Sequence, residues 1–298
     1  MFRQTALAQL ASLLPEISNR TQVVTTERLT DASASEVLTF LARRPLHNVT
    51  LVGIIRDNGL VSPFNRGNFY ACRNRAGKLE GVALIGHATL METRTERAVQ
   101  AFAEIAQQCT TARMIMGEQE RVEEFWNYYS EERQTMRRAC RELLFELRWP
   151  IEVREPAEGL RLATAEDLEL IVPVHARMAF DESGVNPLEI DPVGFRERCL
   201  RRINQGRTWV WVEAGRLIFK TDIVSDTAAV IYLEGIWTAP EHRGKGYGLR
   251  CLSQLGHLLL QRSDSICILV NEQNVAAHEF YKRAGFKFRS VYDTIFLA

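Results

Sequence analysis

The alternation of hydrophobic and polar positions predicts most elements in the second half of the chain. Alternating apolar and polar residues, rich in β-branched and aromatic types, are typical of half-buried strands. Apolar residues at three- and four-residue intervals, as at Leu252, Leu255 and Leu259, are typical of a helix packed on one face. These patterns predict helices at 165–180, 192–204 and 275–284, strands at 160–162, 208–213, 216–224, 229–238 and 265–271, and two closing strands near 286–289 and 292–297.

Capping residues mark the ends of these helices. Asp191 is a typical N-cap, and Pro192 suits the first helical position, where an N–H has no intrahelical partner. Gly285 suits the left-handed residue that follows a helix. Residues 181–191, between the first two helices, are expected to form a loop rich in carboxylates.

The first half of the chain repeats nearly the same order with weaker signals. The expected elements are a hairpin of strands at 68–74 and 79–91, helices at 98–108 and 118–129, and strands at 113–116 and 141–147. Residues 92–99, between the long strand and its helix, contain no glycine. The opening residues 1–14 are expected to form an amphipathic helix, because Gln9 and Ser12 interrupt the apolar run that a signal peptide needs.

Two domains of mixed α/β class are expected. The chain has 298 residues, which suits two domains of about 150 residues each. Residues 149–160 carry two prolines and a glycine, as a linker does. We therefore place the boundary at 153/154, with one domain at 1–153 and another at 154–298. Each domain is expected to be a central mixed sheet flanked by helices.

Composition narrows the partners and the compartment. The 37 basic residues balance the 37 acidic residues, so no positive field favours nucleic acid or an anionic membrane. Small-molecule partners are expected instead. The six cysteines include no C-x-x-C pair, so we expect neither a metal site nor a disulfide framework, and we expect a cytoplasmic location. No apolar run is long enough to span a bilayer.

The most informative segment is the glycine-rich turn at residues 238–248. A strand ends there, and Gly244, Gly246 and Gly248 lead into a helix. Glycine allows positive φ and a close approach of the backbone to a ligand. The N–H groups at a helix N-terminus then bind phosphate, and Arg243 and Lys245 add positive charge. The segment predicts a pyrophosphate site.

Two well-known pyrophosphate motifs do not fit this turn. A nucleotide-triphosphate loop requires glycine where Ala239 stands and Ser or Thr where Gly246 stands. A dinucleotide fold requires G-x-G-x-x-G and an acidic residue at the end of the next strand. Here the spacing is G-x-G-x-G, Asp264 lies before that strand, and Glu272 follows it too late.

The turn closely resembles the pyrophosphate motif of the GNAT acetyltransferase superfamily. Arg243 to Gly248 matches R-x-x-G-x-G, and the strand at 229–238 is similar to the family's fourth strand. A second family motif, N-x-x-A-x-x-x-Y-x-x-x-G-F, is matched at Asn274, Ala277, Tyr281, Gly285 and Phe286. The resemblance covers residues 160–298. The first half resembles the fold in outline only, as in tandem GNAT proteins with one degenerate half.

The resemblance implies that acetyl-CoA is the cosubstrate and that an amine attacks its thioester. Tyr281 is then the acid that protonates the leaving thiolate, although a tyrosine that only packs in the core gives the same pattern. Asn274 is expected to contact the pantetheine amide and to cap a helix. The cofactor-binding residues implied by the resemblance are Ile236, Thr238, Arg243, Gly244, Lys245, Gly246, Tyr247, Gly248, Asn274 and Tyr281.

The general base and the acceptor site are less well marked. Many relatives carry a glutamate earlier on the fourth strand, where this chain has Val230 to Tyr232, so Glu234 is the best available carboxylate. It is either desolvated or at a solvent-facing end of the sheet, and a water-relayed proton remains open. Asp181 and Glu182 are candidates for binding a cationic amine, against the alternative of a solvated loop.

The function expected from the sequence is acetyl-CoA-dependent N-acetylation of a primary amine in a ternary complex. The alternative is a non-catalytic acyl-CoA-binding sensor or scaffold. The first half is expected to bind no CoA, because Glu92, Thr93 and Arg94 stand where a diphosphate needs bare backbone. We expect it to shape the acceptor site instead. The acceptor is expected to be a small-molecule or peptide amine, but the sequence identifies neither which amine it is nor the oligomeric state.

Overall fold

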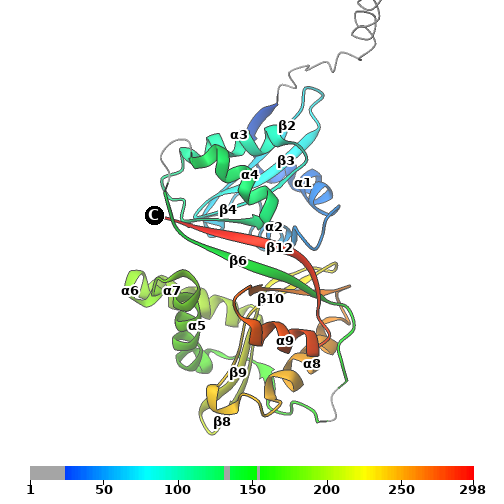
Figure 1. The fold of residues 1–298 in the computed structure, drawn as a ribbon, viewed down its shortest axis with the longest axis vertical. Coiled ribbons are helices and arrows are strands. Elements are labelled where there is room, and N and C mark those ends of the chain that lie inside the picture. The colour runs from blue at the N-terminus through cyan, green and yellow to red at the C-terminus, as the bar shows by residue number, and fades with distance from the viewer. Residues whose placement is uncertain (1–23, 131–134, 153–154) are drawn as a thin grey trace, which may run out of the picture.

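Twelve strands form one mixed sheet in the computed structural model, which describes residues 24–130, 135–152 and 155–298 (Figure 1). The strands are β1 (Thr25–Arg28), β2 (Gly67–Arg73), β3 (Leu79–Gly86), β4 (Ala88–Thr93), β5 (Met114–Glu118), β6 (Met136–Leu147), β7 (Leu160–Leu162), β8 (Thr208–Glu213), β9 (Arg216–Asp226), β10 (Ile231–Thr238), β11 (Ile266–Asn271) and β12 (Lys287–Leu297). Their order across the sheet is β1-β2-β3-β4-β5-β12-β6-β11-β10-β9-β8-β7.

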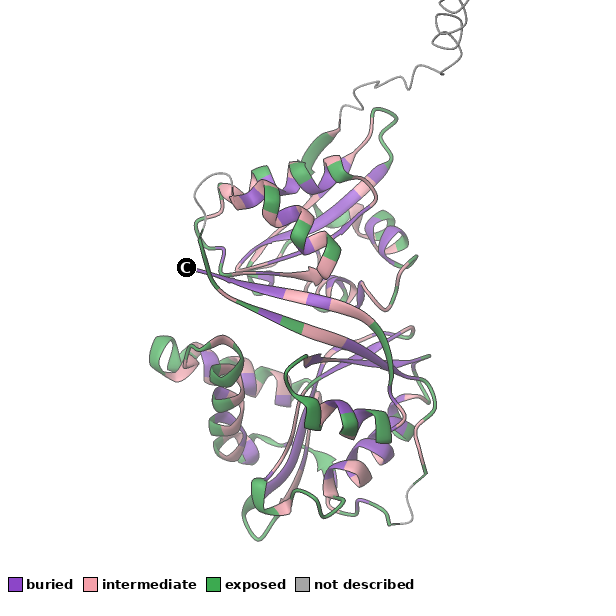
Figure 2. Ribbon diagram, viewed as in Figure 1, coloured by how far each residue is buried: buried purple, intermediate pink, exposed green. Residues whose placement is uncertain are grey.

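Helices cover both faces of this sheet, and Figure 2 shows buried residues along the strands and on parts of the helices. The α-helices are α1 (Ala34–Leu41), α2 (Val49–Asn58), α3 (Glu96–Gln107), α4 (Gln119–Tyr129), α5 (Leu168–Ser183), α6 (Pro187–Ile190), α7 (Pro192–Asn204), α8 (Tyr247–Leu259) and α9 (Val275–Arg283). Within the described ranges, no helix is both long and apolar enough to cross a membrane. All six cysteines are free.

The two halves of the chain exchange their last strands. Strand β6, which ends the first half, pairs antiparallel with β11 of the second half, with Phe145 opposite Ile268. Strand β12, which ends the second half, pairs with β5 of the first half, with Ile295 opposite Ile115. The two long strands run side by side across the middle of the molecule (Figure 1). One continuous sheet therefore brings residues of both halves together.

The sheet opens into a wedge at two places. Parallel strands β10 and β11 pair only at Ile231–Ile266 and Tyr232–Cys267 among the described residues. Strands β4 and β5 likewise pair only at Ala88–Met114 and Thr89–Ile115. Beyond these pairs the strands diverge and leave backbone N–H and C=O groups without a neighbouring strand. Each half thus contains one wedge.

Four groups of helices pack against the sheet. In the second half, α8 and α9 bury Leu252, Leu255 and Tyr281 against one face, and α5 and α7 cover the other face. In the first half, α3 and α4 cover one face and α1 and α2 the other. Helix α2 also reaches the second half, because a Cβ on Gly53 would collide with Ser225 of β9. An ion pair between Arg207 and Asp57 holds the same contact, with 2.7 Å between Nη2 and Oδ1.

The structure confirms the mixed α/β class and corrects three of the elements expected from the sequence. Residues 79–91 form two antiparallel strands, β3 and β4, because the chain folds back after Gly86, where a Cβ would collide with the Arg66 carbonyl. The two closing strands are one strand, β12, with an irregularity between Phe288 and Ser290.

The third correction concerns the expected loop at 181–191. Helix α5 continues to Ser183 and α6 occupies Pro187–Ile190, so Asp181 and Glu182 lie in the last turn of a helix. Helices α1 and α2, for which no sequence prediction was made, also lie in the first half. The helix expected at 1–14 lies outside the described residues.

Candidate active site

The glycine-rich turn lies at the wide end of the wedge between β10 and β11. Gly244 and Gly246 have φ of 73° and 85°, and a Cβ on either would have no heavy atom within 4 Å. Helix α8 begins directly after them, and no side chain caps its N-terminus. The N–H groups of a first helical turn have no intrahelical acceptor. The turn therefore presents open space, free donors and the positive end of a helix dipole to an anion.

Basic and aromatic side chains surround the turn. Lys245 is exposed, and Arg243 Nε donates to the Thr238 carbonyl at 3.1 Å. The guanidinium of Arg250 lies 4.7 Å from the ring centre of Tyr247. A Cβ on Gly248 would lie 2.9 Å from Thr238 Oγ1, so this glycine allows α8 to approach β10 closely. The predicted pyrophosphate residues are thus together on one surface.

A bulge interrupts strand β10 between the turn and the narrow end of the wedge. Glu234 pairs with Asp222 and Trp237 with Lys220, so β10 has one residue more than β9 over this stretch. Gly235 takes φ of 61°, which the added residue requires. Ile236 lies inside the bulge and Thr238 at its outer side. The bulge changes the direction in which the backbone of Ile236 faces.

A fully buried lysine holds this bulge. Lys220 is 0% exposed, and its Nζ donates to the Gly235 carbonyl at 3.2 Å and to Asp222 Oδ2 at 2.7 Å. Thr208 Oγ1 donates to the other oxygen of Asp222 at 2.7 Å. Burial alone would raise the pKa of Asp222, but Lys220, Arg202 and His175 hold it well below its usual value. The bulge is therefore anchored to a buried ion pair.

Three carboxylates from different elements lie close enough for their charges to interact, and we refer to the space between them as the carboxylate cleft. Glu234 is exposed on β10, Glu182 ends α5, and Glu142 lies on β6, which belongs to the first half. Burial, together with the charges of Glu234 and Glu142, raises the pKa of Glu182 to about 8. Burial and the charge of Glu234 also raise the pKa of Glu142, which accepts a 2.9 Å hydrogen bond from Thr294 Oγ1. The cleft concentrates negative charge that a cation would neutralise.

Glu142 had no signal in the sequence. It lies far from both motifs and reaches the cleft only because β6 is exchanged between the halves. Arg137 Nη1 donates to the Ser183 carbonyl at 2.8 Å and ties the end of α5 to this strand. Asp181, in contrast, forms an exposed ion pair with Arg177 at 2.9 Å. No group of three or more His, Cys, Asp or Glu among the described residues is arranged to hold a metal ion.

The second motif lies on the other side of the wedge. Tyr281 on α9 is 9% exposed, and its ring packs against Phe280 and Phe286, with ring centres 5.1 and 5.7 Å apart. Burial raises the pKa of its phenol, so the hydroxyl stays protonated. Asn274 caps α9 by accepting a hydrogen bond from the Ala277 N–H at 3.1 Å. The N-cap interpretation of Asn274 therefore holds in this structure.

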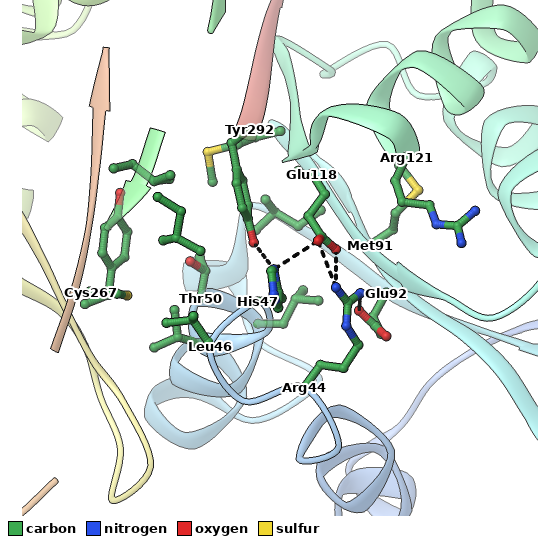
Figure 3. Close-up of a pocket in the computed structure, with 18 of the residues that line it drawn as sticks. Arg44, Leu46, His47, Thr50, Met91, Glu92, Glu118, Arg121, Cys267 and Tyr292 are labelled. Atoms are coloured by element: carbon green, nitrogen blue, oxygen red, sulfur yellow. Dashed lines mark hydrogen bonds and ion pairs between the residues drawn. The ribbon is translucent and has the colours of Figure 1, made fainter. Parts of the chain in front are cut away.

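The wedge of the first half has different contents. Arg44 bridges its two strands, with Nη2 2.7 Å from Glu118 on β5 and Nη1 3.3 Å from Glu92 on β4 (Figure 3). Helix α3, which follows β4, is capped by Thr95, whose Oγ1 accepts from the Ala98 N–H at 3.4 Å. Ion pairs bridge the two strands of this wedge, and the Thr95 side chain accepts a hydrogen bond from the N-terminal turn of α3, whereas no side chain caps α8.

Comparisons with known proteins agree with this arrangement. Residues 177–286 match the acetyltransferase (GNAT) family. A Drosophila protein solved by X-ray crystallography superposes with a TM-score of 0.66 at 14% identity, covering 92% of this chain and 98% of that one. A tandem GNAT protein from the clavulanic acid biosynthesis pathway superposes with a TM-score of 0.57 at 14% identity, with the same coverage of both chains. A GNAT-family acetyltransferase from Colwellia psychrerythraea superposes with a TM-score of 0.54 at 12% identity, covering 92% of this chain and 100% of that one.

No curated protein matches the chain in sequence. The low identities of the solved structures show a shared fold, while the match at 177–286 spans the cleft carboxylate Glu182, the glycine-rich turn and both motifs. Residues 177–286 thus match the acetyltransferase (GNAT) family, and the chain shares its fold with solved GNAT proteins.

Proposed function

We propose that this chain is an acetyl-CoA-dependent N-acetyltransferase whose active site is the wedge between β10 and β11. One observation carries the proposal: the N-terminus of α8 is uncapped behind Gly244 and Gly246, whereas Thr95 caps the matching helix α3. A diphosphate fits the open turn, where a side chain at either glycine would intrude. Acetyl-CoA would supply the activated thioester.

The donor-binding residues follow from this placement. Backbone N–H groups of Gly244 to Gly248, with Lys245 and Arg243 nearby, would hold the pyrophosphate. The pantetheine amides would pair with the free edge of β10 at Ile236 and Thr238, as an added strand does. Tyr247 would pack near the cofactor, and Asn274 would place α9 beside the arm. The bulge at Gly235 would point the Ile236 backbone at the thioester carbonyl.

The acceptor is proposed to be a primary amine that arrives as a cation. Besides burial, the charge of Glu234 raises the pKa values of Glu142 and Glu182, so these carboxylates repel one another, and an ammonium group would relieve that repulsion. Asp181, with its carboxylate paired to Arg177, would act only at the rim. Because Glu142 lies on β6, the first half would contribute directly to acceptor binding.

The chemistry would proceed by direct attack in a ternary complex. Glu234, or a water it holds, would take the proton of the ammonium. The amine nitrogen would then bond to the thioester carbon as the carbon–sulfur bond breaks. Tyr281, kept protonated by burial, would give its proton to the leaving sulfur. The products would be an N-acetyl amide and free CoA.

Gly246→Asp tests the cradle. A carboxylate in the open space at φ 85° would repel the diphosphate and strain the backbone. We expect acetyl-CoA to raise the Tm of the wild type by mass action and to leave the Tm of this variant unchanged. Gly215→Asp is a matched control, since Gly215 has φ of 73° and open space at the β8–β9 turn. An equal ligand-induced shift in Gly246→Asp would remove the cradle from the site.

Release of free CoA thiol from acetyl-CoA with a panel of primary amines tests the reaction itself. Turnover with at least one cationic amine is the expected result. The rival function, an acyl-CoA sensor or scaffold, predicts binding at the cradle with no thiol release for any amine. The carboxylate cleft favours the enzyme, because a sensor has no need of an amine site.

A further inference from the structure

A cavity of about 50 Å³ lies on one face of the sheet, next to the active wedge (Figure 3). Its apolar end is formed by Tyr232, Cys267, Leu269 and Leu144 of the central strands, with Leu46 and Val49 from the first half. Its other end reaches Arg44 and Glu118 in the first-half wedge, where Figure 3 shows them facing each other. The function described above assigns no role to this cavity.

The apolar end of the cavity is at the narrow end of the active wedge. Tyr232 and Cys267 are the innermost pair that joins β10 and β11 before these strands diverge. Leu269 lies two residues further along β11 on the same face, opposite Leu144 of β6. The next pair on this face is Asn271 with Glu142, which belongs to the carboxylate cleft. Tyr232 links the two sites, because it lines the cavity and because burial and the charges of Glu234 and Glu142 raise the pKa of its phenol.

The direction of the donor follows from the position of the cradle. Gly244 to Gly248 follow Thr238, at the wide end of the wedge. A pantetheine arm that starts there and runs inward along β10 toward Tyr232 covers six residues, roughly 20 Å of strand. Its thioester, which would face the Ile236 backbone as proposed above, is the part of the donor nearest the narrow end, and the acyl group would extend from there toward Tyr232. The acyl group would lie beside the cavity, and the amine would approach from the carboxylates.

We propose that this cavity holds the acyl group of the donor, so that the protein transfers acyl groups longer than acetyl. This inference rests on the function proposed above. An acetyl group needs little of the space, whereas the cavity has room for roughly four water-sized atoms. Its leucine, cysteine and tyrosine walls suit an aliphatic chain. The acyl C–S bond breaks and an acyl C–N bond forms, with the proton passing to CoA sulfur, for any acyl length.

The structure also sets an upper limit on the length of the acyl group. The far end of the cavity is closed by the ion pair of Arg44 with Glu118, at 2.7 Å, and with Glu92, which is 4% exposed. A longer chain would have to bury methylene groups against these charges and break their pairing. Short acyl groups of about four carbons are therefore the class of donor that fits.

The test compares acetyl-, butyryl- and octanoyl-CoA with one amine acceptor, by released thiol and by titration calorimetry. Butyryl-CoA should bind more tightly and give a higher kcat/KM than acetyl-CoA, by up to about fourfold per added methylene, and octanoyl-CoA should fall below butyryl-CoA. Leu269→Phe, at a partly exposed wall position, should lower the butyryl-to-acetyl ratio at least tenfold. The control Leu162→Phe, on the edge strand β7, should leave that ratio unchanged.

The outcomes separate this inference from the proposed function. Turnover with acetyl-CoA that is higher than with butyryl-CoA overturns the acyl site and leaves the transferase intact. A ratio that Leu269→Phe does not change overturns it too. If no donor releases thiol, the transferase fails, and the Kd values still decide the acyl site: tighter binding of butyryl-CoA supports it, and equal or weaker binding overturns it.

Discussion

Tyr281 and Glu182 illustrate what a single residue contributes to this site. Tyr281 is buried among aromatic rings on one side of the wedge, and burial raises its pKa, so its hydroxyl stays protonated. Glu182 lies across the wedge with two other carboxylates, and its pKa is raised to about 8. The sequence singled out both residues. Their environments, which decide how each one titrates, come from neighbours on other elements.

Tyr281→Phe removes only the phenol hydroxyl and keeps the buried ring. Folding and acetyl-CoA binding should persist, while kcat falls roughly 10²-fold or more, because the thiolate then leaves without an acid. Steady-state kinetics with a saturating amine measures the change. Tyr70→Phe, on β2 near the opposite end of the sheet, should leave kcat unaltered. Unaltered turnover in Tyr281→Phe would mean that this tyrosine only packs in the core and is not the acid.

Glu182→Gln should make stability less sensitive to alkaline pH. The folded-state pKa of about 8 lies above the unfolded value of about 4.3, so the folded chain binds the proton more tightly. This stabilisation is complete below the unfolded pKa and is lost as pH rises through about 8. The Tm of the variant relative to wild type should therefore increase from about pH 5 to about pH 9.

Glu279→Gln is the matched control for that experiment. The hydrogen bond from Lys282 lowers the pKa of Glu279, so its contribution is present above the unfolded pKa and is lost on acidification. This control should show no gain in relative Tm toward alkaline pH. Equal gains in both variants would mean that the cleft does not set the titration of Glu182.

At the scale of elements, the bulge in β10 is the feature that adapts an ordinary strand to the site. It combines a positive-φ glycine with a buried lysine that bonds the Gly235 carbonyl. The glycine-rich turn and the bulge both depend on φ values that only glycine adopts readily. The sequence predicted the turn, because three glycines mark it. It did not predict the bulge, because a single glycine in a strand does not reveal the lysine beneath it.

Gly235→Ala should disturb the bulge and thereby catalysis. Its Cβ would lie 2.8 Å from Lys220 Nζ, and φ of 61° is unfavourable for alanine by roughly 1–2 kcal/mol. We expect a lower free energy of unfolding and a fall in kcat of roughly tenfold or more. Gly215→Ala carries the same backbone strain in open space, so it should lose stability and keep its kcat. Equal kcat values for the two variants would contradict a positioning role for the bulge.

At the scale of the whole molecule, the exchange of β6 and β12 makes the two halves interdependent. Residues 154–298 alone would lack β6, the strand that lies between β11 and β12. The full chain is therefore the proper object for binding experiments. In the first half, the bridge from Arg44 to both strands and the cap at Thr95 remove the features that a diphosphate and an extended arm require.

Titration calorimetry of the full chain with acetyl-CoA should give one binding site per chain. The glycine turn of the second half accounts for that site. In the first half, the Arg44 bridge and the Thr95 cap leave no comparable site for CoA. Gly246→Asp should abolish the binding heat altogether. Two sites in the wild type, or one remaining site in the variant, would show that the first half also binds CoA.

The sequence by itself determined the mixed α/β class, most element boundaries of the second half and the glycine-rich turn that we propose as the cofactor end of the site. These features depend on short-range rules: alternation along a strand, capping at a helix end, and glycine at positive φ. The glycine turn and the second motif each lie within one short segment, so both can be recognised in the sequence without knowledge of the fold. The sequence signals failed where the chain turned sharply at Gly86 and where α5 ran on past Phe180.

Only the tertiary structure decided which parts of the two halves meet. Glu142 and Thr294, 152 positions apart, are hydrogen-bonded because β6 and β12 are exchanged. The bridge that closes the first wedge joins Arg44 to Glu118, 74 positions away. Strand partners are selected by burial and register across the whole sheet, and no local pattern encodes that choice. The proposed cofactor end of this site was thus set by local backbone chemistry, and the proposed acceptor end by long-range strand pairing.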